Sequence, residues 1–310
     1  MSAVQIMQRH VEEWQKDKDD ISEKNILTLL EDEEYKSLDY AIRNKPFLTA
    51  HKLLDLEKCE LHAKLRYVDL LPLPIEKEND NFTIGSGVEN AITLSQEDFS
   101  DRYAVVKNRS TNEAKALAES GKELLTQGMY DTIHEARREF HSSPHAPKKL
   151  GTKNVIASYS GYVLKAEYDG FNEKTIIPQE LKTCANINTF EKDFHPGNEW
   201  FEMYAFQQSF YSFVYELRNE THYDYVNLFV LDKYDWSRSH KFVLGYNTIL
   251  RPRYDRVQRL IEKWKLCEES GMWSVPDLST MEGRAIFRNS SYYILPMMDE
   301  YKKLISATTF

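Results

Sequence analysis

The segment EYDGFNEKTIIPQELKT, residues 167–183, places two acidic residues two positions apart and then, after a short turn-like interval, a glutamate and a lysine two positions apart. In an extended chain, side chains two positions apart point to the same face. Glu167 and Asp169 would then share one face, and Glu180 and Lys182 would share a face of the next strand. Pairing of the two strands would bring three carboxylates and one ammonium together at one end of a sheet.

Such a group of oxygen ligands suits a hard cation such as Mg²⁺, because substrate phosphate and water complete its coordination shell. Two ions close together would polarise a phosphodiester and lower the pKa of an attacking water, with Lys182 orienting that water or stabilising developing charge. The alternative is a solvated face, because alternating charges on strands commonly form cross-strand ion pairs. The acids precede the E-x-K by about the length of a hairpin, and this order resembles the PD-(D/E)XK class of nucleases.

A long aromatic segment, NEWFEMYAFQQSFYSFVYELRN (198–219), predicts a helix. At helical spacing Gln208 falls within an otherwise apolar face, which contains Phe201, Tyr204, Ala205, Tyr211 and Ser212. A buried amide needs hydrogen-bonding partners, which either an active site or the nearby backbone would supply.

The rest of the chain predicts a mixed α/β fold. Residues 1–45 show two apolar stripes at helical spacing, so we expect an N-terminal helical segment that packs on a single domain over residues 46–310. We expect a loop or linker at EKENDNFTIGSG (76–87) and helix over residues 112–140, interrupted by two glycines. Further expectations are a strand at 225–234, an amphipathic helix at 253–270, and a closing strand and short helix at 291–305.

The composition limits the functional classes. The net charge of -9 argues against a protein that grips nucleic acid through a broad positive surface, although a local basic groove remains compatible with it. The three cysteines lack the paired spacing of a zinc site, which favours free thiols in a reducing compartment. No run reaches the roughly 18 apolar residues of a membrane span, so we expect an intracellular protein without a membrane association.

Five segments in this order resemble the DXO family of RNA decapping exoribonucleases. They are KLRYVDLLPLP (64–74), KAEYDG (165–170), QELKT (179–183), FEMYAFQQSF (201–210) and SYYILPMMDEYKKL (291–304). The resemblance implies two β-sheets flanked by helices around a deep groove, with bound Mg²⁺ or Mn²⁺, as two ions. It implies that the RNA 5′ end is the substrate, that DNA is not, and that a 5′ exonuclease is a possible partner in the nucleus or cytoplasm.

Carried onto this sequence, the family pattern also implies roles for individual residues. The implied metal ligands are Glu167, Asp169, Glu180 and the main-chain carbonyl of Leu181. Lys182 and Gln208 would contact the scissile phosphate or the nucleophilic water.

The sequence departs from the family pattern in two places. The family has an acidic ligand in a "GYKFE" motif, for which the nearest candidate here is Glu123, without the glycine and aromatic positions. The family's "WRG" helix with its substrate-binding arginine is missing. Arg102 is a weak substitute, and an exposed surface arginine is the competing interpretation.

The resemblance implies a metal-dependent decapping hydrolase or 5′–3′ exoribonuclease that acts on incompletely capped or 5′-phosphorylated RNA. Because an oriented substrate is essential for catalysis, loss of one phosphate-positioning arginine could slow the reaction by orders of magnitude. The alternative is therefore a weak or inactive protein of the same fold, which binds RNA or a protein partner in a regulatory role.

Overall fold

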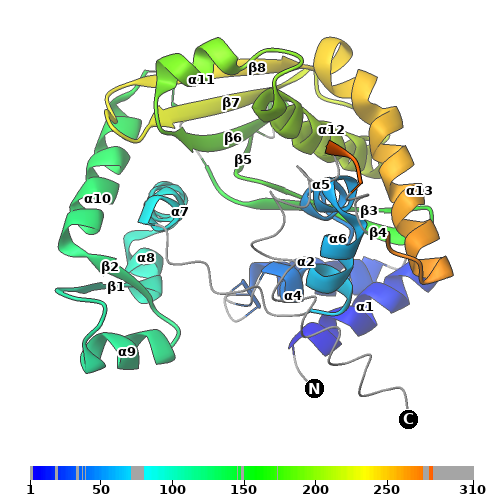
Figure 1. The fold of residues 1–310 in the computed structure, drawn as a ribbon, viewed down its shortest axis with the longest axis horizontal. Helices are drawn as coiled ribbons and strands as arrows, with labels where there is room; N and C mark the ends of the chain where they lie inside the picture. Colours follow the sequence, from blue (N-terminus) through cyan, green and yellow to red (C-terminus); the bar gives the residue numbers. More distant parts are fainter. Residues whose placement is uncertain are drawn as a thin grey trace.

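The structure, a computed structural model, describes residues 3–17, 20–32, 35–36, 38, 40–70, 80–144, 146–147, 150–172, 174–274 and 279–281. Within them the chain has a mixed α/β fold in which helices flank β-sheets, as the sequence predicted (Figure 1). The expected strand and helix at 291–305 lie outside the described residues. Every helix in the described part of the chain is too short or too polar to span a lipid bilayer.

A four-stranded sheet forms the centre of the molecule. Its strands, in spatial order, are β5 (Gly170–Asn172), β6 (Ile177–Cys184), β7 (Tyr225–Asp232) and β8 (Ser239–Gly245). β6 and β7 run parallel, whereas β5 and β8 are antiparallel to their neighbours. A parallel pair needs a long crossover connection, which α11 (Ile187–Asp193) and α12 (Glu199–Asn219) provide.

A separate hairpin, β3 (Lys153–Tyr159) and β4 (Tyr162–Tyr168), precedes this sheet in the chain. Because β4 continues through Asp169 into β5, one extended segment links the hairpin to the central sheet. We expected the two acid-bearing strands to pair with each other directly. Instead β4 pairs with β3, and only the short β5 pairs with β6, so Asp169 lies at the junction between the two sheets.

The region expected to be helical over residues 112–140 contains a strand. α9 (Asn112–Glu119) ends before Gly121, which has a φ of 89°, and β2 (Glu123–Thr126) follows before α10 (Gln127–Ser142). β2 pairs in parallel with β1 (Tyr103–Val106). The helix-forming residues of β2 adopt the extended form because this pairing buries Leu125 completely, so tertiary packing overrides their local propensity.

The region expected to be a loop at 76–87 is described from residue 80, and from there it is helical, as the start of α7 (Asp80–Thr93). Its two glycines allow close packing. A Cβ added at Gly87 would lie 2.4 Å from Cδ1 of Ile133 on α10, and one added at Gly85 would lie 3.4 Å from Oγ1 of Thr183 on β6. The glycines that lower helix propensity therefore let α7 approach both α10 and the central sheet.

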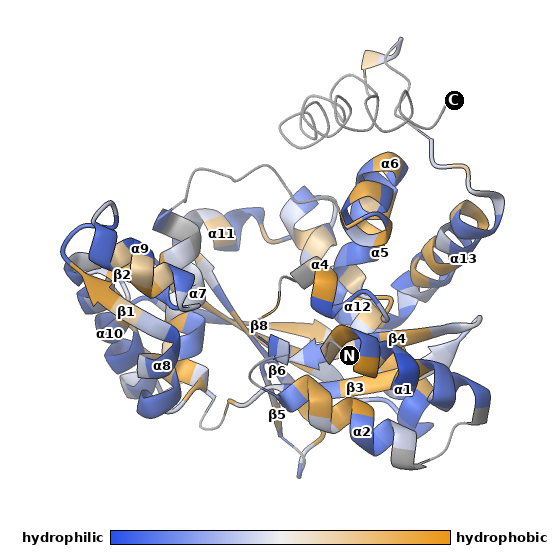
Figure 2. Cartoon of the chain, turned by 90° about the horizontal axis from the view of Figure 1, so that it is seen from below, coloured by the Kyte–Doolittle hydropathy of each residue, from blue (hydrophilic) through white to orange (hydrophobic). Residues whose placement is uncertain are grey.

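The core lies between the sheets and α12, where apolar residues gather (Figure 2). α1 (Ala3–Asp17) and α2 (Asp20–Glu31) pack on the β3–β4 hairpin through a cluster that includes Ile156 and Val163. The predicted helices at 198–219 and 253–270 and the predicted strand at 225–234 are confirmed. The remaining elements are α4 (Tyr40–Arg43), α5 (Ala50–Lys58), α6 (Glu60–Ala63), η1 (Lys64–Val68), α8 (Gln96–Arg102), η2 (Tyr246–Leu250), η3 (Arg251–Arg253) and α13 (Tyr254–Ser270).

Candidate functional site

The carboxylates of Glu89, Asp169 and Glu180 lie around the ammonium of Lys182, where α7, β6 and the junction between β4 and β5 meet. Nζ of Lys182 lies 2.6 Å from Oε1 of Glu180 on the same face of β6, as the strand period predicted. Desolvation alone would lower the pKa of Lys182. The charges of Glu180, Asp169 and Glu89 instead raise this pKa well above its usual value, so the ammonium is firmly charged.

Glu89 on α7 is the acidic residue that sequence reasoning missed. Burial raises its pKa, and its carboxyl group shares a hydrogen bond with that of Asp169. Burial also raises the pKa of Asp169 to about 7, and the charge of Glu89 adds to this rise against the opposing charge of Lys182. The signal available in the sequence was a single glutamate in GVENAI (87–92), a stretch with apolar residues at helical spacing.

Glu180 lies at the buried end of this group, with its side chain 2% exposed. Burial raises its pKa to about 7, helped by Asp169 and opposed by Lys182 and Gln208. Nε2 of Gln207 donates to Oε1 of Glu180 at 3.4 Å. By hydrogen-bond geometry, Oε2 of Glu180 and both polar atoms of Gln208 have no partner among the described residues. Gln208 itself is 1% exposed, so its burial in the apolar face of α12 is confirmed.

Glu167, two residues before Asp169, has a different environment. Nζ of Lys165 donates to its Oε2 at 3.0 Å, from the same face of β4. Burial alone would raise the pKa of Glu167, but the charges of Lys165, Arg43 and Lys36 lower it. Glu167 is therefore ionised in surroundings rich in positive charge, whereas Asp169 lies in surroundings rich in negative charge.

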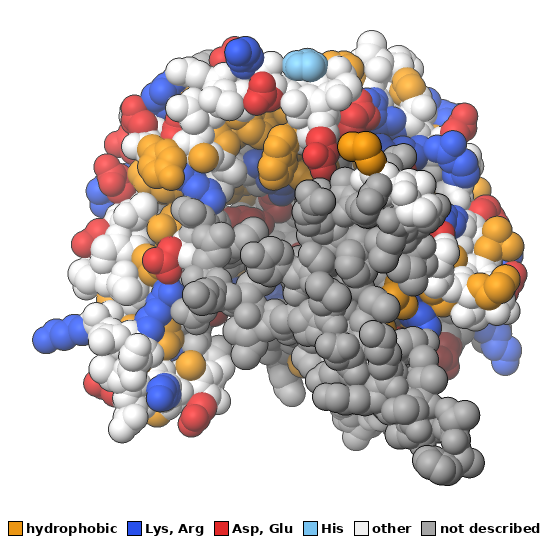
Figure 3. All heavy atoms as spheres, viewed as in Figure 1, with side chains coloured by type: hydrophobic (Ala, Val, Ile, Leu, Met, Phe, Trp, Pro, Cys, Tyr) orange, Lys and Arg blue, Asp and Glu red, His pale blue; other side chains and the backbone are white. Residues whose placement is uncertain are grey.

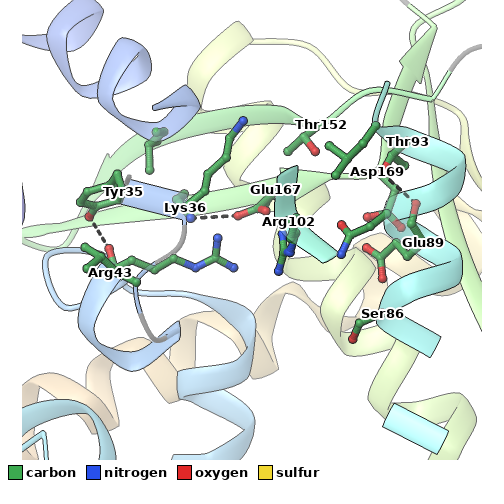
Figure 4. Close-up of a pocket in the computed structure, with 15 residues that line it drawn as sticks. Tyr35, Lys36, Arg43, Ser86, Glu89, Thr93, Arg102, Thr152, Glu167 and Asp169 are labelled. Carbon is green, nitrogen blue, oxygen red and sulfur yellow. Dashed lines mark hydrogen bonds and ion pairs between the residues drawn. The ribbon is translucent and has the colours of Figure 1, made fainter. Parts of the chain in front are cut away.

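A cavity of about 380 Å³ connects these environments. Figure 4 shows Glu89 and Asp169 together on one side of it, with the Arg43 side chain extending toward Glu167 on the other. Its volume lies in the range of small-ligand pockets. Its lining residues are Leu30, Tyr35, Lys36, Leu38, Arg43, Ser86, Glu89, Asn90, Thr93, Leu94, Arg102, Thr152, Lys165, Glu167 and Asp169.

Glu123, which the sequence suggested as a further acidic ligand, is not among the main charges that act on Lys182 and Asp169 in the structure. Glu123 is on β2, where its Oε1 accepts from Nε of Arg102 at 2.9 Å. Their side chains are 42% and 43% exposed, respectively. Arg102 does line the cavity, so this arginine connects Glu123 to the site. The sequence distance to the E-x-D pair was plausible, but the small β1–β2 sheet holds Glu123 elsewhere.

The main chain of Leu181 faces the candidate site. Its amide donates to Oδ2 of Asp169 at 2.8 Å. Because the N–H and C=O of one strand residue point to the same edge, the carbonyl of Leu181 also points away from β7 and toward Asp169. This position is compatible with the carbonyl ligand implied by the family resemblance.

His51, near the start of α5, also faces this region. Although its side chain is exposed, the protein around the imidazole desolvates it and lowers its pKa, and the charges of Lys182 and Arg66 act in the same direction. The opposing charges of Asp55 and Glu167 do not reverse this shift. The imidazole is therefore neutral near pH 7 and can accept a proton. Sequence reasoning missed His51 because only the tertiary fold brings it near β6.

The charge and chemistry of this group fit a hard divalent cation. Glu89, Asp169 and Glu180 offer only oxygen atoms, and when all are ionised their charge exceeds that of Lys182 by two units. The unpartnered Oε2 of Glu180 is a free ligand position. Among the described residues, no group of three or more aspartate, glutamate, histidine or cysteine side chains is arranged so that it could hold a metal ion by itself. An open site of this kind requires substrate oxygens and water to complete the shell.

The surrounding surface carries charges of both signs. Among the side chains coloured in Figure 3, Lys and Arg alternate with Asp and Glu rather than forming one continuous basic face. The sequence predicted this from the net charge of -9.

No protein-family model and no curated protein matches this sequence. The fold is similar to the crystal structure of a protein from Eubacterium rectale described as "Putative exonuclease". The TM-score is 0.55 at 12% sequence identity, and the alignment covers 75% of this chain and 85% of that chain. At this identity the likeness concerns the fold, so the chain has a fold similar to that of a protein described as a nuclease.

Proposed function

We propose that this protein is a metal-dependent nuclease that acts on the 5′ end of RNA, in the manner of the DXO family. One observation carries the proposal: Glu89, Asp169 and Glu180 converge on Lys182 beside a cavity. A solvated strand face, the competing interpretation, does not account for a glutamate that is 2% exposed with an unpartnered oxygen.

In this proposal Glu89, Asp169, Glu180 and the carbonyl of Leu181 would hold Mg²⁺ or Mn²⁺, with Glu167 at the margin. When bound, such ions supply a water of lowered pKa and polarise the phosphodiester. The protein's own residues orient the substrate. Lys182 stabilises negative charge that develops on the phosphoryl oxygens, and Gln208 directs its two unpartnered polar atoms to the phosphate or the water.

The direct test is release of nucleotides from 5′-monophosphate RNA in the presence of Mn²⁺. We expect wild-type protein to release them, and Glu180→Ala combined with Lys182→Ala to abolish the release. Capped and 5′-triphosphate RNA of the same sequence would show whether the protein also removes modified ends. Absence of turnover on all three substrates would contradict the proposal.

The second candidate is a binding protein on the same fold with little catalysis. It is favoured by the ion pair between Lys182 and Glu180, which already satisfies one carboxylate oxygen without a metal. The absence of a WRG motif from the sequence also favours a binding protein with little catalysis. Wild-type protein that binds RNA but shows no metal-dependent turnover would distinguish this candidate from the first. Association with a 5′ exonuclease, implied by the resemblance, stays a prediction for either candidate.

A further inference from the structure

One face of α12 leads from the carboxylate group toward the protein surface. Gln207 marks the inner end of this face, because its Nε2 donates to Oε1 of Glu180 at 3.4 Å. Trp200 and Tyr204 precede Gln207 by seven and three residues, so at helical spacing the three side chains project from the same side of the helix. At a rise of about 1.5 Å per residue, Tyr204 lies roughly 5 Å and Trp200 roughly 10 Å from Gln207 along the helix axis.

Solvent exposure rises along this face toward the start of the helix. Gln207 is 7% exposed, Tyr204 is half-buried and Trp200 is 60% exposed. The other four tryptophans of the chain are buried or half-buried. A single exposed apolar side chain is common on protein surfaces. Trp200 differs from that common case because it is in line with a residue that contacts the candidate site.

Tyr204 is supported by neighbouring rings and lies close to the charged group. Its ring centroid lies 6.1 Å from that of Phe190 and 6.2 Å from that of Phe194, at the end of α11. Burial raises the pKa of its hydroxyl, while the charges of Lys182 and Glu180 act on this pKa in opposite directions. Tyr204 is therefore a neutral aromatic side chain near the residues proposed to bind the metal and the phosphate.

Aromatic rings in line with a phosphodiester site suit the bases of a single-stranded nucleic acid. Every base has a π-face, so stacking on an aromatic side chain binds a strand with little dependence on its sequence. The net charge of -9 limits what phosphate contacts outside the site contribute, so a bound strand needs contacts of this non-ionic kind. A protein partner would require a broader apolar patch, whereas the residues before Trp200, HPGNE (195–199), are mainly polar or small.

We propose that Trp200 and Tyr204 form a base-stacking platform for the nucleotides on the 3′ side of the scissile phosphate. The inference rests on the proposed function for its ligand, an RNA strand whose 5′ end lies at the carboxylate group. Because this face of α12 reaches solvent at Trp200, the rest of the strand leaves the protein there. The platform predicts that the bases of the second and third nucleotides contribute to affinity whatever their identity.

The test is equilibrium binding of a five-nucleotide RNA that carries fluorescein at its 3′ end. Fluorescence polarisation is measured with Ca²⁺ in place of Mn²⁺, so that binding is followed without cleavage. One RNA is intact, and a second lacks the bases of nucleotides two and three but keeps their phosphates. Stacking of one base corresponds to roughly a tenfold change in Kd, so we expect wild type to bind the intact RNA at least about tenfold more tightly than the abasic RNA. Trp200→Ala should weaken binding of the intact RNA about tenfold and leave binding of the abasic RNA unchanged.

Three further variants make the result specific. Trp200→Phe should keep most of the preference for the intact RNA, because a phenyl ring still stacks on a base. Tyr204→Leu, which keeps an apolar side chain against Phe190 and Phe194, should reduce the preference. Tyr234→Ala is the control, because Tyr234 is 80% exposed in the loop between β7 and β8 and should not affect the preference. Equal binding of the two RNAs to wild type, or equal losses in Trp200→Ala and Tyr234→Ala, would overturn the platform.

The outcomes separate this inference from the proposed function. A preference for the intact RNA that depends on Trp200, without any hydrolysis in Mn²⁺, supports the platform and contradicts the nuclease proposal. Hydrolysis with the same Kd for the intact and abasic RNAs supports the nuclease and overturns the platform. If Trp200→Ala binds both RNAs as wild type does but no longer associates with a 5′ exonuclease, the platform is overturned and Trp200 belongs to a protein interface.

Discussion

Gln207 and Gln208 are adjacent buried amides on α12 with different partners. Nε2 of Gln207 donates to the hydroxyl of Tyr211 at 3.0 Å and to Oε1 of Glu180 at 3.4 Å. By distance and angle neither polar atom of Gln208 has a hydrogen-bond partner among the described residues, although the buried amide lies near enough to Glu180 to lower the pKa of that carboxyl. A buried polar group without a partner lowers stability, and natural proteins retain one where it has a function. We therefore expect Gln207 to contribute to the stability of the fold and Gln208 to contribute to function.

Replacement of each glutamine by methionine, which has a similar shape, separates these contributions. Gln208→Met should raise the free energy of unfolding by about 1–3 kcal/mol, because an unsatisfied buried amide is removed. It should also lower metal-dependent turnover at least tenfold. Gln207→Met should lower the free energy of unfolding by about 1 kcal/mol, because a hydrogen-bonded amide is lost. Urea unfolding and RNA hydrolysis provide the two measurements; a Gln208→Met protein that is destabilised and fully active would contradict this assignment.

Glu89 and Glu123 provide a matched pair for the metal site. Glu89→Gln should lower Mn²⁺ affinity and turnover by at least tenfold, because it removes one charged ligand from the group around Lys182. Glu123→Gln should change both by less than twofold, because its carboxylate binds Arg102 at a surface position. Isothermal titration with Mn²⁺ measures the affinity without substrate. Equal effects of the two substitutions would place the ligand set elsewhere.

Local spacing explains which site residues the sequence could predict. Glu167, Asp169, Glu180 and Lys182 follow from the two-residue period of strands, and Gln208 follows from the spacing of an apolar helix face. Glu89 comes from another helix, and no spacing in one segment shows that α7 packs beside β6. The sequence distance that favoured Glu123 carried no such information.

At the scale of the element, α7 is held by contacts that local propensity does not describe. The acidic, polar character of residues 76–87 predicted a loop, and Gly85 and Gly87 are each unfavourable inside a helix by roughly 1 kcal/mol relative to alanine. The helix forms because those positions face Ile133 and Thr183 at short range. Strands β6 and β7 and helices α12 and α13, by contrast, have patterns that agree with their tertiary environment, and the sequence predicted all four.

Gly87→Val tests this packing. The added Cβ would lie 2.4 Å from Cδ1 and 3.1 Å from Cγ1 of Ile133, so we expect a loss of about 1–3 kcal/mol in the free energy of unfolding. Displacement of α7 would also weaken Mn²⁺ binding through Glu89. Ile133→Ala in the same chain should recover part of both losses. Gly128→Val is the control, because a Cβ there meets nothing within 4 Å; if it is as harmful as Gly87→Val, close packing is not the reason for the glycine.

At the scale of the whole molecule, the site lies where separately predictable parts meet. The N-terminal segment contributes Lys36 and Arg43, the hairpin contributes Glu167, and the central sheet contributes Glu180. Asp169 lies at the bend between the two sheets. The sequence pattern did not indicate this bend, because it predicted that the strands carrying the acidic residues pair with each other directly. The carboxylates therefore come together only in the folded chain, and the energy of holding them together makes stability depend on pH and on cations.

The sign of this dependence follows from the raised pKa values. Asp169 and Glu180 have pKa values of about 7, above the value near 4 of an unfolded carboxyl group, so the folded protein binds more protons than the unfolded chain between these limits. Without metal, the contribution of these groups to stability is present at acidic pH and is lost as the pH rises through about 7.

A divalent cation competes with the protons bound to Asp169 and Glu180, so Mn²⁺ should raise the Tm more at pH 8 than at pH 6. The Kd for Mn²⁺ should fall by up to about tenfold per pH unit for each proton that the ion displaces. Thermal unfolding with and without Mn²⁺ over pH 5–8 measures this linkage, and Asp169→Asn should reduce its steepness, because one displaceable proton is removed. A shift in Tm that is the same at every pH would show that the ion binds without displacing protons from these two carboxyl groups.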